Sequence, residues 1–153
     1  MFVSCWIHAH TSIKGGWFVK RGCDRMRRTS PNRIRLEFQG RTLDFQLEAD
    51  QPYALIATDA FEEWINSIGD VRTNARITKD VYKMRRGLFG DWKEADGVFE
   101  MRLDYGPGYR VYYAKYGRFV IILLGGGDKG SQNADLRSAR RLWEELKNAL
   151  KEV

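Results

Sequence analysis

The chain has 153 residues, of which 43% are hydrophobic and 13% aromatic, and its formal net charge is +6. This composition excludes a wholly disordered chain and predicts one domain with a real core plus a short appendage. No apolar run reaches the length of a membrane-spanning helix, and the first residues lack the pattern of a secretion signal. We therefore expect a cytoplasmic protein with an anionic partner and no membrane contact.

Residues 1–50 are predicted to form an N-terminal extension. Residues 1–52 hold nine Lys/Arg and five Asp/Glu, a surplus of +4, against +2 for residues 53–153. Two cysteines and two histidines fall in "CWIHAH" and at Cys23, but their spacing matches no zinc pattern, so we predict neither a metal site nor a cofactor. Residues 33–47 alternate apolar and polar side chains around "QGRT", which is typical of a β-hairpin.

Two interpretations of this extension stay open. In one, it is an extra hairpin that docks on the main sheet and blocks or steers a site there. In the other, the start codon is assigned too far upstream, and Met26 is one internal alternative. The irregular leading segment favours the second interpretation, whereas the alternating stretch 33–47 favours the first.

The main domain is predicted to span residues 53–153 and to begin after the break "ADQP". "YALIA" predicts a short strand, and "TDAFEEWINSIG" a short helix capped by Asp59, with Glu62 completing a capping box. Asp70 is expected to cap a second helix that runs to about Arg86 and forms a helical hairpin with the first. "RGLFGDW" is expected to be a loop.

The rest of the domain predicts three strands and a final helix. The strands cover about 98–104, 109–115 and 118–125, and the turns "YGPG" and "KYGR" make them an antiparallel meander. "FVIILL" is apolar on both faces and is expected to be covered on both sides. Ser131 or Asn133 is expected to cap the final helix. The predicted fold class is α+β, with an antiparallel sheet packed on helices.

Three cations are predicted to gather near one edge of this sheet. Side chains alternate along a strand, so Arg102 faces away from Phe99 and Met101, and the turn can bring Arg110 onto the same face. Lys129 follows the last strand at its rim. Such a set can bind phosphate, but cations on an exposed sheet face are also common as solubility charges. The nearby tyrosines are candidates for base stacking, although at least half of them are expected to be structural.

The stretches "GLFGDWKEADGVFEMRLDYGPGYRVYY" and "VIILLGGGDKGSQNADLRSARRL" resemble the HigB-like "addiction module killer" branch of the RelE/ParE toxin superfamily. The resemblance rests on the order G-x-F-G-D-x-K, then G-V-x-E-x-R-x-D-Y-G-P-G-Y-R-V-Y, then L-x-G-G-D-K-x-x-Q. It covers about residues 53–153. It implies a RelE/ParE-like fold, with a helical hairpin, an antiparallel meander and a C-terminal helix.

The resemblance also implies the toxin of a type II toxin–antitoxin pair, a ribosome-dependent endoribonuclease that cuts mRNA and inhibits translation. Arg110 matches the arginine of G-Y-R, and Arg102 and Lys129 match basic positions on the neighbouring strand and after the last strand, so these three are the implied catalytic residues. The resemblance leaves the general acid and base open. Weaker candidates for RNA binding or support are Glu100, Tyr109, Tyr112 and Asp128.

The chain departs from the RelE pattern at two places. Glu100 stands where a second basic residue is frequent, and "NADLRS" lacks the tyrosine that often enters the last helix. Two alternatives therefore remain: a ParE-like inhibitor of DNA gyrase, and a catalytically inactive relic that only binds antitoxin. The implied partners are an antitoxin with a helix-turn-helix DNA-binding domain, the ribosome and mRNA, with operator DNA bound only through the antitoxin complex.

Overall fold

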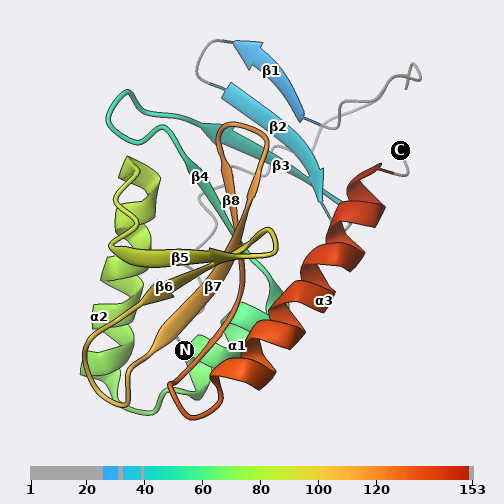
Figure 1. Ribbon diagram of the computed structural model, residues 1–153. Coiled ribbons are helices and arrows are strands. Elements are labelled where there is room, and N and C mark those ends of the chain that lie inside the picture. Colours follow the sequence, from blue (N-terminus) through green and yellow to red (C-terminus); the bar gives the residue numbers. More distant parts are fainter. Residues whose placement is uncertain (1–25, 31–32, 39, 152–153) are drawn as a thin grey trace.

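The computed structural model describes residues 26–30, 33–38 and 40–151, and these residues form two β-sheets and three α-helices (Figure 1). The strands are β1 (Met26–Ser30), β2 (Arg33–Phe38), β3 (Arg41–Gln46), β4 (Ala54–Ala57), β5 (Asp91–Ala95), β6 (Val98–Arg102), β7 (Arg110–Tyr116) and β8 (Val120–Gly127). The helices are α1 (Asp59–Ser67), α2 (Val71–Tyr82), the 3-10 helix η1 (Lys83–Arg86) and α3 (Gln132–Lys151). The fold is α+β, as predicted. Cys5, His8, His10 and Cys23, and with them the leading segment 1–25, lie outside the described residues.

The main sheet has five strands in the order β4-β8-β7-β6-β5. β6, β7 and β8 form the predicted antiparallel meander, but β4 pairs in parallel with β8, so the prediction of a wholly antiparallel sheet is wrong. The reason is connectivity, because α1 and α2 follow β4 and carry the chain away before the meander returns β8 beside it. β8 is buried on both faces, as its apolar run predicts.

The predicted helical hairpin is present as α1 and α2. Asp70 is the N-cap of α2, and its carboxylate accepts a hydrogen bond from the Thr73 amide at 2.8 Å. The N-cap of α1 is Thr58 rather than Asp59, so that part of the prediction is wrong. Thr58 is 2% exposed, and its hydroxyl donates to the Leu123 carbonyl at 2.8 Å, which ties the helix start to β8. Asp59 instead occupies the first helical turn, where it still favours the positive end of the helix dipole.

The two faces of the main sheet bury separate hydrophobic clusters. α1 and α2 pack on the face that carries Met101, Val111 and Tyr113. α3 packs on the opposite face, which carries Tyr112 and Ala114. The two clusters follow from strand alternation, since successive residues of β7 enter opposite cores.

A second, three-stranded sheet has the order β1-β2-β3 (Figure 1). Its buried residues belong to the hydrophobic cluster on the side of the main sheet that α3 also covers. β2 and β3 form the predicted hairpin, with Phe38 opposite Arg41, and β1 adds a strand that the sequence did not predict. Ile34 and Leu36 are fully buried in the same cluster as Leu146 of α3. The hairpin therefore docks on the main domain through this shared cluster, which also holds main-sheet residues such as Ala54 and Ile122. None of its described residues lines the candidate anion-binding pocket, so a role in blocking or steering a site stays a prediction.

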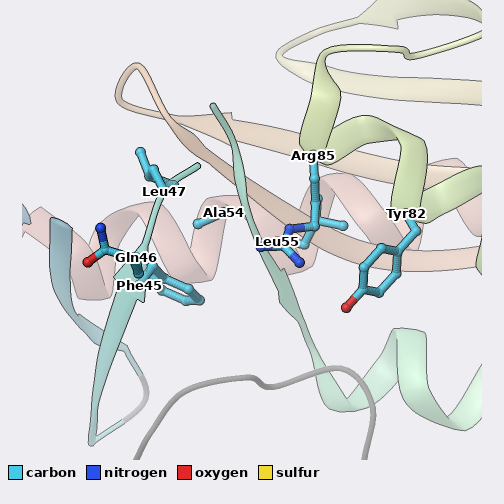
Figure 2. Close-up of a pocket in the computed structure, with 7 residues that line it drawn as sticks. All are labelled: Phe45, Gln46, Leu47, Ala54, Leu55, Tyr82 and Arg85. Carbon is cyan, nitrogen blue, oxygen red and sulfur yellow. The ribbon is translucent and has the colours of Figure 1, made fainter. Parts of the chain in front are cut away.

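A small cavity of about 40 Å³ lies where β3 meets β4 and the end of α2 (Figure 2). It is lined by Phe45, Gln46, Leu47, Ala54, Leu55, Tyr82 and Arg85. A cavity of this size holds a few water molecules and is too small for a nucleotide.

β5 is a strand that the sequence did not predict, and it occupies residues expected to belong to a loop and its flank. It pairs antiparallel with β6 and forms an edge of the main sheet, with Asp91 opposite Arg102. Four of its five side chains are exposed, so it lacks the apolar alternation by which strands are recognised. Charged side chains on an edge strand also discourage pairing with other chains.

Candidate anion-binding site

A pocket of about 630 Å³ opens where α2, the end of β6, the turn after it and the segment after β8 meet. It is lined by Arg76, Asp80, Lys83, Leu88, Gly90, Asp91, Met101, Arg102, Leu103, Asp104, Tyr105, Gly108, Tyr109, Arg110 and Lys129. Five of these residues are cationic and three are acidic, so the lining has a net charge of +2. All three predicted catalytic cations, Arg102, Arg110 and Lys129, lie in this one pocket.

The backbone brings the three cations together. Arg102 of β6 and Arg110 of β7 are direct cross-strand partners, so their side chains share a face. The turn between these strands then reaches the third cation, since the Lys129 amide donates to the Pro107 carbonyl at 3.4 Å. Gly108 lies between Lys129 and the Arg110 side chain and has a φ of +76°. A Cβ at this position would lie 3.5 Å from the Lys129 Cβ and 3.6 Å from Nη1 of Arg110.

Arg102 forms an exposed ion pair. Its Nη2 lies 2.8 Å from Oδ1 of Asp91 on β5, and the two side chains are 43% and 66% exposed. Exposed pairs contribute between about 0 and 1 kcal/mol, so an incoming anion can displace Asp91 at little cost.

Arg110 is held much more firmly. Its Nε donates to Glu100 at 3.1 Å and its Nη1 to the Gly108 carbonyl at 2.8 Å, and only 12% of the side chain is exposed. Glu100 is fully buried. Separating a buried pair leaves a buried charge unpaired, which costs about 3–5 kcal/mol. Arg110 is therefore fixed in orientation before any ligand arrives.

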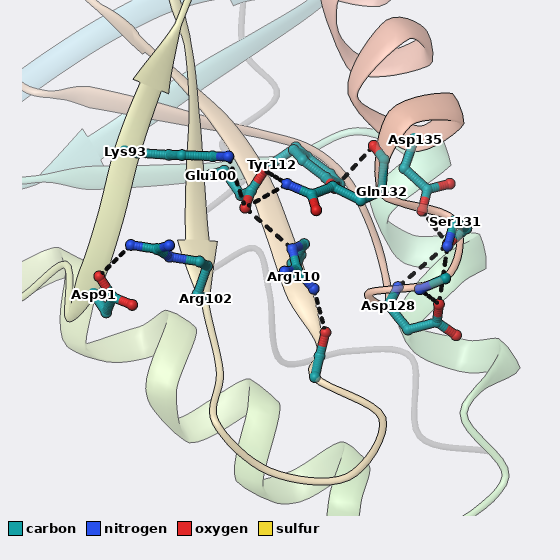
Figure 3. A network of polar contacts seen from close by, with 12 residues as sticks. Asp91, Lys93, Glu100, Arg102, Arg110, Tyr112, Asp128, Ser131, Gln132 and Asp135 are labelled. Atoms are coloured by element: carbon teal, nitrogen blue, oxygen red, sulfur yellow. Dashed lines mark hydrogen bonds and ion pairs between the residues drawn. The ribbon is translucent and has the colours of Figure 1, made fainter.

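Glu100 is the centre of a polar network (Figure 3). Besides Arg110, it accepts hydrogen bonds from Nε2 of Gln132 at 3.1 and 3.2 Å, and the Lys93 ammonium lies 3.7 Å away. Gln132 is the first residue of α3, so the network joins three strands to the start of that helix. With both oxygens occupied, this carboxylate orients Arg110 and is a poor candidate for a general base.

Lys129 is exposed, as Arg102 is, but it differs from both arginines in its pairing. Within the part of the chain that the structure describes, its ammonium makes no ion pair or side-chain hydrogen bond. It is therefore available to an anion without displacing a protein group. Asp128 beside it is engaged, because its carboxylate accepts the amides of Gly130 and Ser131 at 2.7 and 3.1 Å and so orders the entry to α3.

The two predicted tyrosines differ in accessibility. Tyr112 is fully buried, and its hydroxyl donates to the Gln132 carbonyl at 3.4 Å. Burial, reinforced by the charge of Glu100, raises the pKa of Tyr112, so its hydroxyl stays protonated and its ring is closed to a nucleic-acid base. Tyr109 is half-buried and lines the pocket, so it alone of these two can contact a ligand.

Sequence reasoning missed a group of pocket residues on α2 and in the turn after β6. Arg76 and Asp80 stand one helical turn apart, and the Arg76 guanidinium lies 3.8 Å above the Tyr105 ring centre. The Tyr105 hydroxyl donates to Asp80 at 3.0 Å. Burial, followed by this hydrogen bond, raises the pKa of Tyr105. The helical spacing of Arg76 and Asp80 was visible in the sequence, but nothing in it joined α2 to the distant "YGPG" turn.

A second groove, of about 360 Å³, lies between α1 and α3 beside the last residues of β8. Small residues such as Ala60, Gly125 and Ala139 line it. It contains none of the predicted site residues. Among the described residues, no group of three or more His, Cys, Asp or Glu side chains is arranged to hold a metal ion. No helix in that same part of the chain is long and apolar enough to cross a membrane.

Comparison with known proteins gives one informative relative. The chain is 40% identical over 90 residues to a protein of Haemophilus influenzae (strain ATCC 51907 / DSM 11121 / KW20 / Rd) that carries the name "Uncharacterized protein". The match covers 58% of this chain and 91% of the relative, so the chain belongs to the same family as that protein. No family model matches the chain, and no solved structure matches it.

Proposed function

We propose that the chain is the toxin of a type II toxin–antitoxin pair, with a HigB-like form of the RelE/ParE fold, and that it cuts mRNA on the ribosome and so inhibits translation. The observation that carries the proposal is the convergence of Arg102, Arg110 and Lys129 on one pocket. Its proposed partners are a neighbouring-gene antitoxin with a helix-turn-helix domain, the ribosome and mRNA, and it acts in the cytoplasm.

The proposed chemistry is attack of a ribose 2′-oxygen on the adjacent phosphorus. The new P–O2′ bond forms as the P–O5′ bond breaks; the 2′-proton leaves and the departing 5′-oxygen gains a proton. In the transition state between these two bonding arrangements, negative charge builds on the phosphoryl oxygens. Fixed cations stabilise that charge without reorganising during the reaction, and Arg110, held by Glu100 and Gly108, has this property. Lys129 and Arg102 add positive charge beside it.

A ParE-like inhibitor of DNA gyrase is the second candidate. The observation that favours it is the pairing of both strand arginines with carboxylates, Arg102 with Asp91 and Arg110 with Glu100. In a site that cuts RNA, at least Asp91 has to give way to the phosphate. A protein that only binds a partner needs no such exchange.

Primer extension on cellular mRNA after induction of the protein separates the two candidates. The proposal predicts cuts confined to translated messages and in frame with the codons. Gyrase-dependent DNA breaks with intact mRNA would reject it. The matched inactive control is the double substitution Arg102→Ala and Lys129→Ala, because both side chains are exposed and their loss leaves the core unchanged. Arg110→Ala is a weaker control, since it strips buried Glu100 of its partner and lowers stability.

A further inference from the structure

Arg76 presents a flat cation on the wall of the anion-binding pocket. Its side chain is exposed, comes from α2, and lies with the guanidinium carbon 3.8 Å from the centre of the Tyr105 ring. At that distance the guanidinium is in contact with the face of the ring. Arg76 lines the same pocket as Arg102, Arg110 and Lys129.

The Tyr105 ring beneath Arg76 is held by a hydrogen bond of its hydroxyl and by a contact with a second aromatic ring. The Tyr105 hydroxyl donates to Oδ2 of Asp80 at 3.0 Å, and the other oxygen of that carboxylate lies 2.6 Å from the Lys83 ammonium. Tyr105 also contacts Tyr109 at a centroid separation of 6.1 Å. The raised pKa of Tyr105 keeps its hydroxyl a donor at all physiological pH values. The ring is thus a fixed support, and the guanidinium on it loses little further freedom when a ligand arrives.

The charges around this wall select the kind of group that it accepts. Asp80 is already shared by Tyr105 and Lys83, and in the described part of the chain Arg76 has no ion pair of its own. Asp80 and Asp104 both act electrostatically on Tyr105, so two carboxylates lie near the wall. These two carboxylates offset the charges of Arg76 and Lys83, so this wall attracts a phosphate less than the side that carries Arg102, Arg110 and Lys129, whereas stacking of an uncharged planar group needs no net charge.

We propose that the Arg76–Tyr105 stack is a platform for an unpaired nucleobase, so that the pocket takes a single-stranded RNA segment with one base on this wall and its phosphate at Arg102, Arg110 and Lys129. The inference rests on the proposed RNA-directed function and adds the residues that recognise the base. Stacking on aromatic rings or guanidinium planes is a common way for proteins to hold single-stranded bases. The pocket volume of about 630 Å³ falls within the range of sites for small ligands.

The test compares two RNA oligomers of equal length and phosphate number, one with all bases and one abasic, by fluorescence anisotropy with the full-length protein. Arg76→Lys keeps the charge but removes the plane. We expect this substitution to weaken binding of the base-containing oligomer about tenfold, in line with measured stacking contributions, and to leave abasic binding unchanged. Arg72→Lys is the matched control, because Arg72 is exposed one turn earlier on α2 and does not line the pocket.

The outcomes separate the inference from the function on which it rests. Equal wild-type affinity for both oligomers, or an equal effect of Arg76→Lys on both, would overturn the base platform while leaving phosphate recognition in place. If the wild type binds neither oligomer, the proposed phosphate site fails, and the platform with it. Weaker binding of both oligomers by the Arg102→Ala variant is the result expected of a phosphate contact.

Discussion

At the scale of single residues, the Tyr113 hydroxyl is buried and has no hydrogen-bond partner among the described residues. The ring itself packs well, stacked with Phe89 and Phe99 at centroid separations of 5.7 and 5.3 Å. Burial raises the pKa of Tyr113, so its hydroxyl stays protonated, and its hydrogen has no acceptor among the described residues. An unsatisfied buried polar group costs about 1–3 kcal/mol.

Tyr113→Phe is therefore expected to leave the free energy of unfolding unchanged or to raise it by about 1 kcal/mol. Tyr112→Phe is the control, because it removes a hydroxyl that donates to the Gln132 carbonyl and should lower stability by roughly 1 kcal/mol. Urea unfolding followed by circular dichroism measures both. A loss of more than about 1 kcal/mol in Tyr113→Phe would mean that the hydroxyl has a partner after all.

The residues of the site were predictable to different degrees. Strand alternation and the turn placed Arg102 and Arg110 on one face, which the register confirms. The role of Glu100 was not predictable, because it depends on Gln132 arriving from α3, and no local pattern fixes that distance. Arg76 was missed for the same reason: it reaches the pocket from α2, far away in the sequence.

At the scale of elements, β5 supplies the acidic residue that occupies Arg102. Asp91 is directly opposite Arg102 in the ladder, and both side chains are exposed. A phosphate that binds Arg102 competes with this carboxylate. Asp104 lines the same pocket without an ion pair among the described residues. It therefore adds the same negative charge to the pocket but does not compete with a phosphate for Arg102.

Asp91→Asn is expected to tighten binding of single-stranded RNA about threefold, since an exposed ion pair contributes at most about 1 kcal/mol. Asp104→Asn, the matched control, removes the same charge from the same pocket and should give a clearly smaller gain. Fluorescence anisotropy at a fixed salt concentration measures both affinities. Equal gains in the two variants would show that only the net charge matters and that Asp91 does not compete.

The elements themselves were predicted unevenly for physical reasons. The helices α1, α2 and α3 have clear apolar stripes, and all three were predicted, although the N-cap of α1 is Thr58 rather than the predicted Asp59. β5 has an exposed sequence with no apolar face, and only its pairing with β6 makes it a strand. The parallel pairing of β4 with β8 is a long-range contact, which the short turns of the meander say nothing about.

At the scale of the whole molecule, the N-terminal sheet shares its core with the main domain. Leu36 is fully buried in one cluster with Trp143 and Leu146 of α3. The sequence predicted both the hairpin and a boundary at residues 49–52, but only the structure shows that apolar side chains on the two sides of that boundary pack together. Leu36 and its partners on α3 are more than 100 residues apart in the sequence, so no local pattern could predict that they pack together.

Leu36→Ala is expected to lower the free energy of unfolding of the entire protein by roughly 2–5 kcal/mol, with a single transition, because it opens a cavity in a shared core. Arg41→Ala, an exposed position in the same sheet, is the control and should change stability by less than about 0.5 kcal/mol. Calorimetry and circular dichroism report the number of transitions. An unchanged main transition in Leu36→Ala would instead make the N-terminal sheet an independent appendage.

The most direct test of the central claim adds purified protein to a translating extract and maps new 5′ ends on a defined message. A second message, identical except for a disabled start codon, reports whether cutting needs translation. The proposal predicts cuts in the translated message only, and none with the variant that carries both Arg102→Ala and Lys129→Ala. The proposal would be contradicted if both messages stayed intact although the wild-type protein was folded and the extract was translating.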